Sequence, residues 1–169
     1  FSVALGDLDG DGDLDLVAGN YEQRNRLYLN NGTTDPFAGV VGSDITADVY
    51  RTLNVALGDL DGNGAVDIVY GPIQSLPPRV IFNDGQGRLS ERGVNPMPTA
   101  PAEVYQIALA DLDGDRGADL VVHVRRRNDP TQHSVAVALT DALAGFLRSS
   151  RREIALLDPH GKIRSASEG

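Results

Sequence analysis

The stretch Val-Ala-Leu-Gly-Asp-Leu-Asp-Gly at residues 3–10 occurs again, unchanged, at residues 55–62. A third version, Ile-Ala-Leu-Ala-Asp-Leu-Asp-Gly, stands at residues 107–114, so both steps are 52 residues long. Repetition at a fixed period indicates a repeat architecture. The sequence therefore predicts three tandem units, at residues 1–52, 53–104 and 105–153.

Each unit contains the pattern of four short strands. Apolar residues alternate with small ones in the repeated stretch, which predicts a first strand before each acidic turn. Second strands are expected at residues 14–18, 66–70 and 118–124, and third strands at 26–29, 79–82 and 134–139. Fourth strands are expected to start at Phe37, Leu89 and Phe146. Four strands in roughly 50 residues are typical of a propeller blade, so we expect an all-β protein with β-propeller-type tandem repeats and three four-stranded blades.

The segment at residues 154–169 departs from this pattern. Two short apolar runs flank Pro159-His160-Gly161, which is turn chemistry. The segment is predicted to be a C-terminal hairpin or a partial fourth unit, and the sequence leaves both open.

Composition removes several classes of function. The chain has 169 residues, no cysteine and a net charge of −9, which excludes thiolate chemistry and disulfides and argues against nucleic-acid binding. No apolar run approaches the roughly eighteen residues that a membrane-spanning helix needs, so membrane insertion is not expected. No nucleophile elbow or phosphate-binding loop is present, and we expect a protein that is not an enzyme.

The acidic turns have the composition of metal-binding loops. Oxygen-bearing side chains recur at alternate positions, and the seventh position can offer its backbone carbonyl; such all-oxygen sets suit Ca²⁺, which takes six to eight oxygen ligands. Leu8 and Leu14 are expected to anchor the first loop to the core. The candidate ligands in the first loop are Asp7, Asp9, Asp11, Asp13 and Asp15. In the second loop they are Asp59, Asp61, Asn63, Ala65 and Asp67, and in the third Asp111, Asp113, Asp115, Gly117 and Asp119.

The third loop differs from the other two at one position. Arg116 replaces the glycine found at Gly12 and Gly64, so a positive charge lies beside the expected ion and the backbone loses conformational freedom. We therefore expect the third site to be the weakest. About three Ca²⁺ ions are expected in all, and they would reduce the net charge from −9 to about −3.

The loops resemble those of the FG-GAP/VCBS repeat family, which includes the propeller blades of integrin α-subunits. The family pattern is similar to Asp-x-Asp-x-Asp-Gly-x-x-Asp followed by an apolar strand. The first loop matches it directly, and the second matches it with Asn63 at the third acidic position. The third matches except at Arg116. The resemblance implies propeller blades, bound calcium and an extracellular or cell-surface protein.

Three blades do not close a propeller ring, which uses about four to eight. We therefore expect a secreted module in adhesion, scaffolding or self-assembly into a larger ring or filament. Its expected partners are other protein chains: copies of itself or the rest of a longer propeller. The alternative is the non-catalytic or substrate-binding propeller portion of a secreted carbohydrate-active enzyme, with carbohydrate as a possible ligand.

Overall fold

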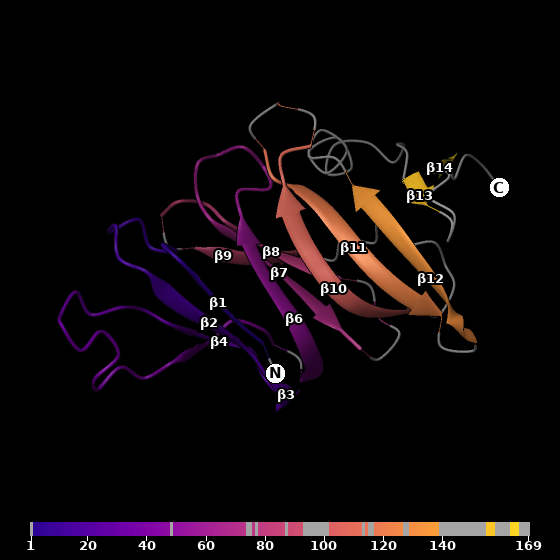
Figure 1. Ribbon diagram of the computed structural model, residues 1–169. Helices are drawn as coiled ribbons and strands as arrows, with labels where there is room; N and C mark the ends of the chain where they lie inside the picture. Colours follow the sequence, from indigo (N-terminus) through magenta and orange to yellow (C-terminus); the bar gives the residue numbers. More distant parts are fainter. Residues whose placement is uncertain are drawn as a thin grey trace.

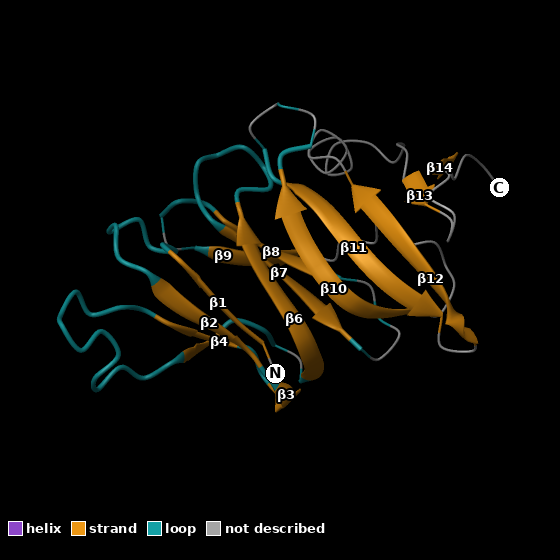
Figure 2. Cartoon of the chain, in the orientation of Figure 1, coloured by secondary structure: helices purple, strands orange, loops and turns teal. Residues whose placement is uncertain are grey.

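The computed structural model describes residues 2–47, 49–73, 76, 78–86, 88–92, 102–112, 114, 117–126, 129–138, 155–157 and 163–165. Every regular element within these residues is a β-strand, and the strands form three antiparallel sheets that stand side by side (Figure 1, Figure 2). No helix in the described part of the chain has the length and apolar character required to span a bilayer. The protein is therefore all-β, as the sequence predicts.

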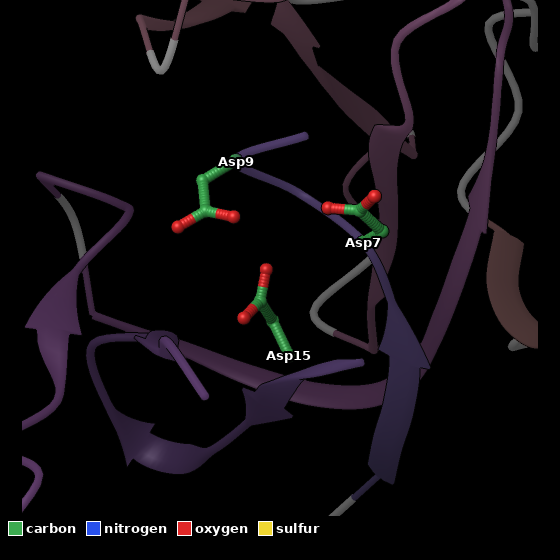
Figure 3. Close-up of side chains that lie close together, drawn as sticks. All are labelled: Asp7, Asp9 and Asp15. Carbon is green, nitrogen blue, oxygen red and sulfur yellow. The ribbon is translucent and has the colours of Figure 1, made fainter. Parts of the chain in front are cut away.

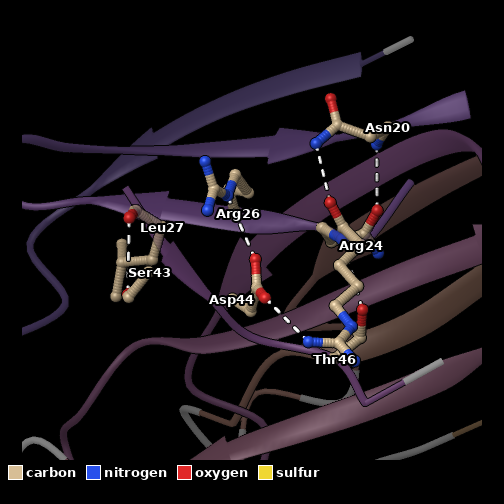
Figure 4. A network of polar contacts seen from close by, with 8 residues as sticks. Asn20, Arg24, Arg26, Leu27, Ser43, Asp44 and Thr46 are labelled. Carbon is tan, nitrogen blue, oxygen red and sulfur yellow. Dashed lines mark hydrogen bonds and ion pairs between the residues drawn. The ribbon is translucent and has the colours of Figure 1, made fainter. Parts of the chain in front are cut away.

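The first sheet has four strands in the order β1-β2-β4-β5. Its strands are β1 (Ser2–Gly6), β2 (Asp15–Gly19), β4 (Arg26–Tyr28) and β5 (Ser43–Asp44). The short outer strand is held by charge as well as by the backbone ladder. Asp44 accepts hydrogen bonds from Arg24 Nη1 at 3.0 Å and from Arg26 Nε at 3.1 Å (Figure 4).

The second sheet has the order β3-β6-β7-β8-β9. Its strands are β3 (Tyr21–Gln23), β6 (Tyr50–Gly58), β7 (Asp67–Pro72), β8 (Arg79–Asn83) and β9 (Leu89–Arg92). The first of these pairs with Tyr50 and Arg51 at the start of β6, a strand that runs from the first unit into the second. Arg51 fixes it there, because its guanidinium pairs with Glu22 and lies 5.0 Å from the centroid of the Tyr21 ring.

The third sheet has the order β10-β11-β12-β13-β14. Its strands are β10 (Ala102–Ala110), β11 (Asp119–Arg126), β12 (Asp129–Ala138), β13 (Ala155–Leu157) and β14 (Ile163–Ser165). The last two pair with each other, and β13 pairs with β12. The C-terminal strands therefore extend the edge of the third sheet. The strand expected from Phe146 lies outside the described residues.

Two apolar clusters join the sheets face to face. The first, between the first and second sheets, contains Leu8, Val17, Leu27, Ile68, Tyr70 and Ile81. The second, between the second and third sheets, contains Leu60, Val69, Val80, Phe82, Val104, Leu120 and Val122. The second sheet is consequently buried on both faces, and its strand β7 is buried at every position. This explains the continuous apolar run in β7, because a strand covered on both faces has no polar side.

Two local expectations are wrong. The fourth strand of the first sheet does not start at Phe37, because hydrogen-bonded turns occupy that segment and Gly39 has a φ of +73°; the strand is Ser43–Asp44. Leu8 anchors its loop as expected and is 3% exposed, whereas Leu14 is 55% exposed. Leu14 lies on the face of the first sheet that no other sheet covers within the described residues.

Candidate metal centre

The three acidic loops connect hairpins that close at equivalent strand pairs. The pairs are Gly6 with Asp15, Gly58 with Asp67, and Ala110 with Asp119. The loop's first aspartate thus follows one strand directly, and its last aspartate begins the next. Hairpin pairing alone brings the two ends of each acidic segment together.

The loop backbones are held by the same hydrogen bonds in each unit. The last aspartate accepts from the second residue of the loop: Asp15 from Leu8 N at 2.8 Å, Asp67 from Leu60 N at 2.8 Å and Asp119 from Leu112 N at 2.7 Å. The first aspartate accepts from the fourth residue: Asp7 from Gly10 N at 2.7 Å, Asp59 from Gly62 N at 2.8 Å and Asp111 from Gly114 N at 2.7 Å. The described part of the third loop therefore repeats the geometry of the other two.

Glycine is required where each of the first two loops turns back. Gly12 and Gly64 have φ values of +92° and +85°, in the left-handed region where a side chain is strained. Their N–H groups donate to Asp7 and Asp59, at 3.0 and 2.8 Å. The equivalent residue of the third loop is Arg116, which lies outside the described residues.

In the first loop, three carboxylates converge on one space. Asp7, Asp9 and Asp15 each offer an oxygen, and these oxygens lie within 4.8 Å of one another. Figure 3 shows the three side chains pointing toward a shared region from the end of β1, the loop and the start of β2. Partial desolvation raises the pKa of Asp9, and the negative charges of its neighbours, Asp15 foremost, raise it further. A cation placed among these groups would relieve that repulsion.

The second loop repeats the cluster with Asp59, Asp61 and Asp67, whose oxygens also lie within 4.8 Å of one another. Asp67 is completely buried. Burial raises its pKa to about 6, and the charges of Asp61 and Asp59 add to the rise, although hydrogen bonds from the backbone of Asn83 and Leu60 oppose it. The loop therefore presents a buried carboxylate whose charged form is disfavoured despite two backbone hydrogen bonds.

The remaining candidates are not part of these clusters. Asp11 is exposed and accepts a hydrogen bond from Asp13 N at 2.8 Å. The Asn63 side chain makes hydrogen bonds within the protein: its Oδ1 accepts from Ala65 N and its Nδ2 donates to Asn83 O. Asp13 and Ala65, which were expected to act through their carbonyls, lie in the same loops. In the third loop Asp113 and Asp115 lie outside the described residues, while Asp119 and Gly117 are buried and Asp111 is exposed.

Sequence reasoning missed two asparagines that support the loops. Asn30 follows the third strand of the first unit and Asn83 ends that of the second, and their N–H groups donate to Asp15 and Asp67, both at 2.8 Å. The Asn83 side chain also donates to Leu8 O at 2.7 Å, which links the second unit to the first loop. Both asparagines stand two residues before a glycine in a turn, and this shared position in the sequence could have identified them. A cavity of about 380 Å³ opens beside this link, between the first loop and the second.

The donor set fits calcium. Oxygen ligands of Ca²⁺ lie about 2.3–2.6 Å from the ion, so ligands on opposite sides of it are up to about 5 Å apart. The 4.8 Å limit within each triad is compatible with that spacing. Only oxygen atoms are offered, which disfavours zinc and copper. Both triads can therefore hold a metal ion of this type.

Stacked antiparallel sheets with acidic hairpin loops define a class of protein: an all-β repeat array with candidate metal sites. Comparison with known families is more specific. Residues 7–70 match the family model of the FG-GAP-like repeat, and this match spans both triads. That part of the chain is an FG-GAP-like repeat, in agreement with the resemblance found in the sequence. No curated protein sequence matches the chain.

Proposed function

We propose that this protein is an extracellular, calcium-stabilised segment of a β-propeller-type array that acts in adhesion, scaffolding or assembly. The observation that carries the proposal is the repeated aspartate triad at the end of a hairpin, directly beside the surface on which the next sheet packs. An ion in that place would fix the loop and thereby the sheet edge. About three ions are proposed, one for each loop.

The proposed role is structural and not enzymatic. Calcium would neutralise loops that hold half of the chain's acids, twelve of twenty-four, and would favour close approach of further sheets. The proposed partners are other protein chains, copies of this one or further repeats of a longer propeller. The three sheets would be blades of such an array. An extracellular setting supplies the millimolar calcium that modest sites require.

Calorimetric titration tests the metal sites. The native chain should bind Ca²⁺ with a stoichiometry near three and bind Mg²⁺ more weakly. Asp9→Ala and Asp61→Ala should each lower the stoichiometry by about one, because each removes an exposed member of a triad. Asp35→Ala is the matched control, since it removes one exposed acid outside the triads. Absence of calcium binding, or equal losses in all three variants, would refute the proposal.

A further inference from the structure

The first two sheets pack by placing branched side chains over glycines. A Cβ added at Gly19 would lie 2.6 Å from Val55 Cγ2, so no side chain fits there. At Gly6, an added Cβ would lie 3.0 Å from Leu57 and 3.5 Å from Val66. We call Val55, Leu57 and Val66 the knob residues of the second unit, and the two glycines the socket of the first.

The second and third sheets repeat this arrangement 52 residues later. A Cβ added at Gly71 would lie 3.1 Å from Ile107, and one at Gly58 would lie 3.0 Å from Leu109 and 3.2 Å from Ala118. The knob residues of the third unit therefore occupy the socket of the second. Two successive interfaces in one molecule use the same positions, so the packing is a property of the repeat.

The residues of the first unit that lie 52 positions before Val55, Leu57 and Val66 are Val3, Leu5 and Leu14, and these are its knob residues. They are 67%, 56% and 55% exposed. Asn30 lies on the same unit at the position of Asn83, whose side chain donates to the loop of the preceding unit. The outer face of the first sheet thus carries the apolar groups with which the other two sheets contact their predecessors, and the asparagine with which the second sheet makes a polar contact.

The third sheet does not offer a matching socket. The positions that correspond to Gly58 and Gly71 are Ala110 and His123. The His123 ring lies 6.2 Å from the Tyr105 ring, centroid to centroid, so an imidazole occupies the place where the socket leaves space. A side chain at this position would collide with the docked unit, because even a single Cβ at Gly71 would come within 2.6 Å of Val104 and 3.1 Å of the knob residue Ile107.

We infer that the outer face of the first sheet docks a further repeat unit that carries glycine at the position of Gly19 and Gly71, and that the third sheet of another copy, with His123 there, is not that partner. The inference rests on the proposed assembly function and names its partner. Docking continues the interface that the molecule already makes twice. It would cover the knob residues of the first unit and give Asn30 a carbonyl partner in the loop of the added unit.

A fusion of residues 53–104 directly before residue 1 tests the inference on the full chain. The junction keeps the 52-residue period, so the added unit presents Gly58 and Gly71 to Leu5 and Val3. Units of a repeat array stabilise their neighbours, and we expect the fusion to melt in one transition, about 5 °C above the native chain. Leu5→Asp should abolish this rise in the fusion. In the native chain it should change the melting temperature little, because Leu5 is exposed there.

Two matched variants make the outcome specific. Gly71→His in the added copy alone, which introduces the residue of the third unit, should also abolish the rise. Val49→Asp should not, because Val49 is equally exposed and lies outside the first sheet. A fusion with a separate melting transition, or one insensitive to Leu5→Asp, would overturn the inference.

Two further results separate this inference from the proposed function. If the added unit binds calcium but does not dock, the inference fails and the calcium-binding function stands. If light scattering shows that the native chain forms dimers that Leu5→Asp dissociates, a second copy is the occupant and the inference is overturned.

Discussion

Substitution of Gly19 by alanine should destabilise the junction between the first two sheets. The added Cβ would lie 2.6 Å from Val55 Cγ2 and 2.7 Å from Thr52 Cγ2, and Thr52 is completely buried. Ordinary contact requires roughly 1 Å more, and relief of such overpacking typically costs about 1–3 kcal/mol. Alanine also lowers the conformational entropy of the unfolded chain, which offsets about 0.4–1 kcal/mol of this cost. The expected net loss of unfolding free energy is therefore about 1–2 kcal/mol.

Urea unfolding at millimolar calcium, followed by far-ultraviolet circular dichroism, measures this difference. Gly6→Ala is the matched control, because its Cβ would meet the flexible end of Leu57 at 3.0 Å and Val66 at the ordinary contact distance of 3.5 Å. That variant should lie within about 0.5 kcal/mol of the native chain, in the range of tolerated substitutions. If Gly19→Ala is as stable as Gly6→Ala, the glycines are not required by sheet packing, and the account of the interfaces is wrong.

Three further predictions concern the loops. Asn83→Ala should lower the unfolding free energy by about 1–3 kcal/mol in urea titrations, because it leaves the Leu8 carbonyl without its partner. Asn30→Ala should cost less, because the two hydrogen bonds of its side chain, with Leu14 O and Gly32 N, are exposed and lie within its own unit. In calcium-free buffer, the unfolding free energy of the native chain relative to Asp67→Asn should fall as the pH rises from about 4 to about 6. The reason is that burial raises the folded pKa of Asp67 above its unfolded value, so the charged form is disfavoured only in the folded protein; a pH-independent difference would contradict this. Arg116→Gly should tighten the weakest calcium site in calorimetry, and an unchanged titration would refute the ranking of the third loop.

Much of the fold could be predicted because it repeats. The identical stretches around Asp7 and Asp59 fix where strands begin and end, and the described strands follow them in all three units. The alternate acidic positions placed the members of both triads among a larger set of candidate ligands. The spacing could not distinguish Asp9, which joins the triad, from Asp11, which accepts a bond from its own turn. That choice depends on backbone dihedral angles within the loop.

Features that arise between units could not be predicted from one unit's pattern. Strand β3 joins the second sheet by pairing with Tyr50 and Arg51, and the ion pair of Arg51 with Glu22 connects residues 29 positions apart. Exposure of Leu14 depends on whether another sheet covers that face, and the residue itself is as apolar as Val66. The glycine sockets are visible in the sequence only once the packing shows what Gly19 and Gly71 avoid.

Thermal unfolding of the native chain with calcium and with excess chelator tests the central claim most directly. A site with a Kd of about 10⁻⁴ M contributes about 1.4 kcal/mol at 1 mM calcium, so three sites contribute about 4 kcal/mol. For a chain of this size, that corresponds to a shift on the order of 10 °C. We predict that chelation lowers the melting temperature by about this amount and that added calcium restores it. An identical melting temperature in both conditions would contradict the account.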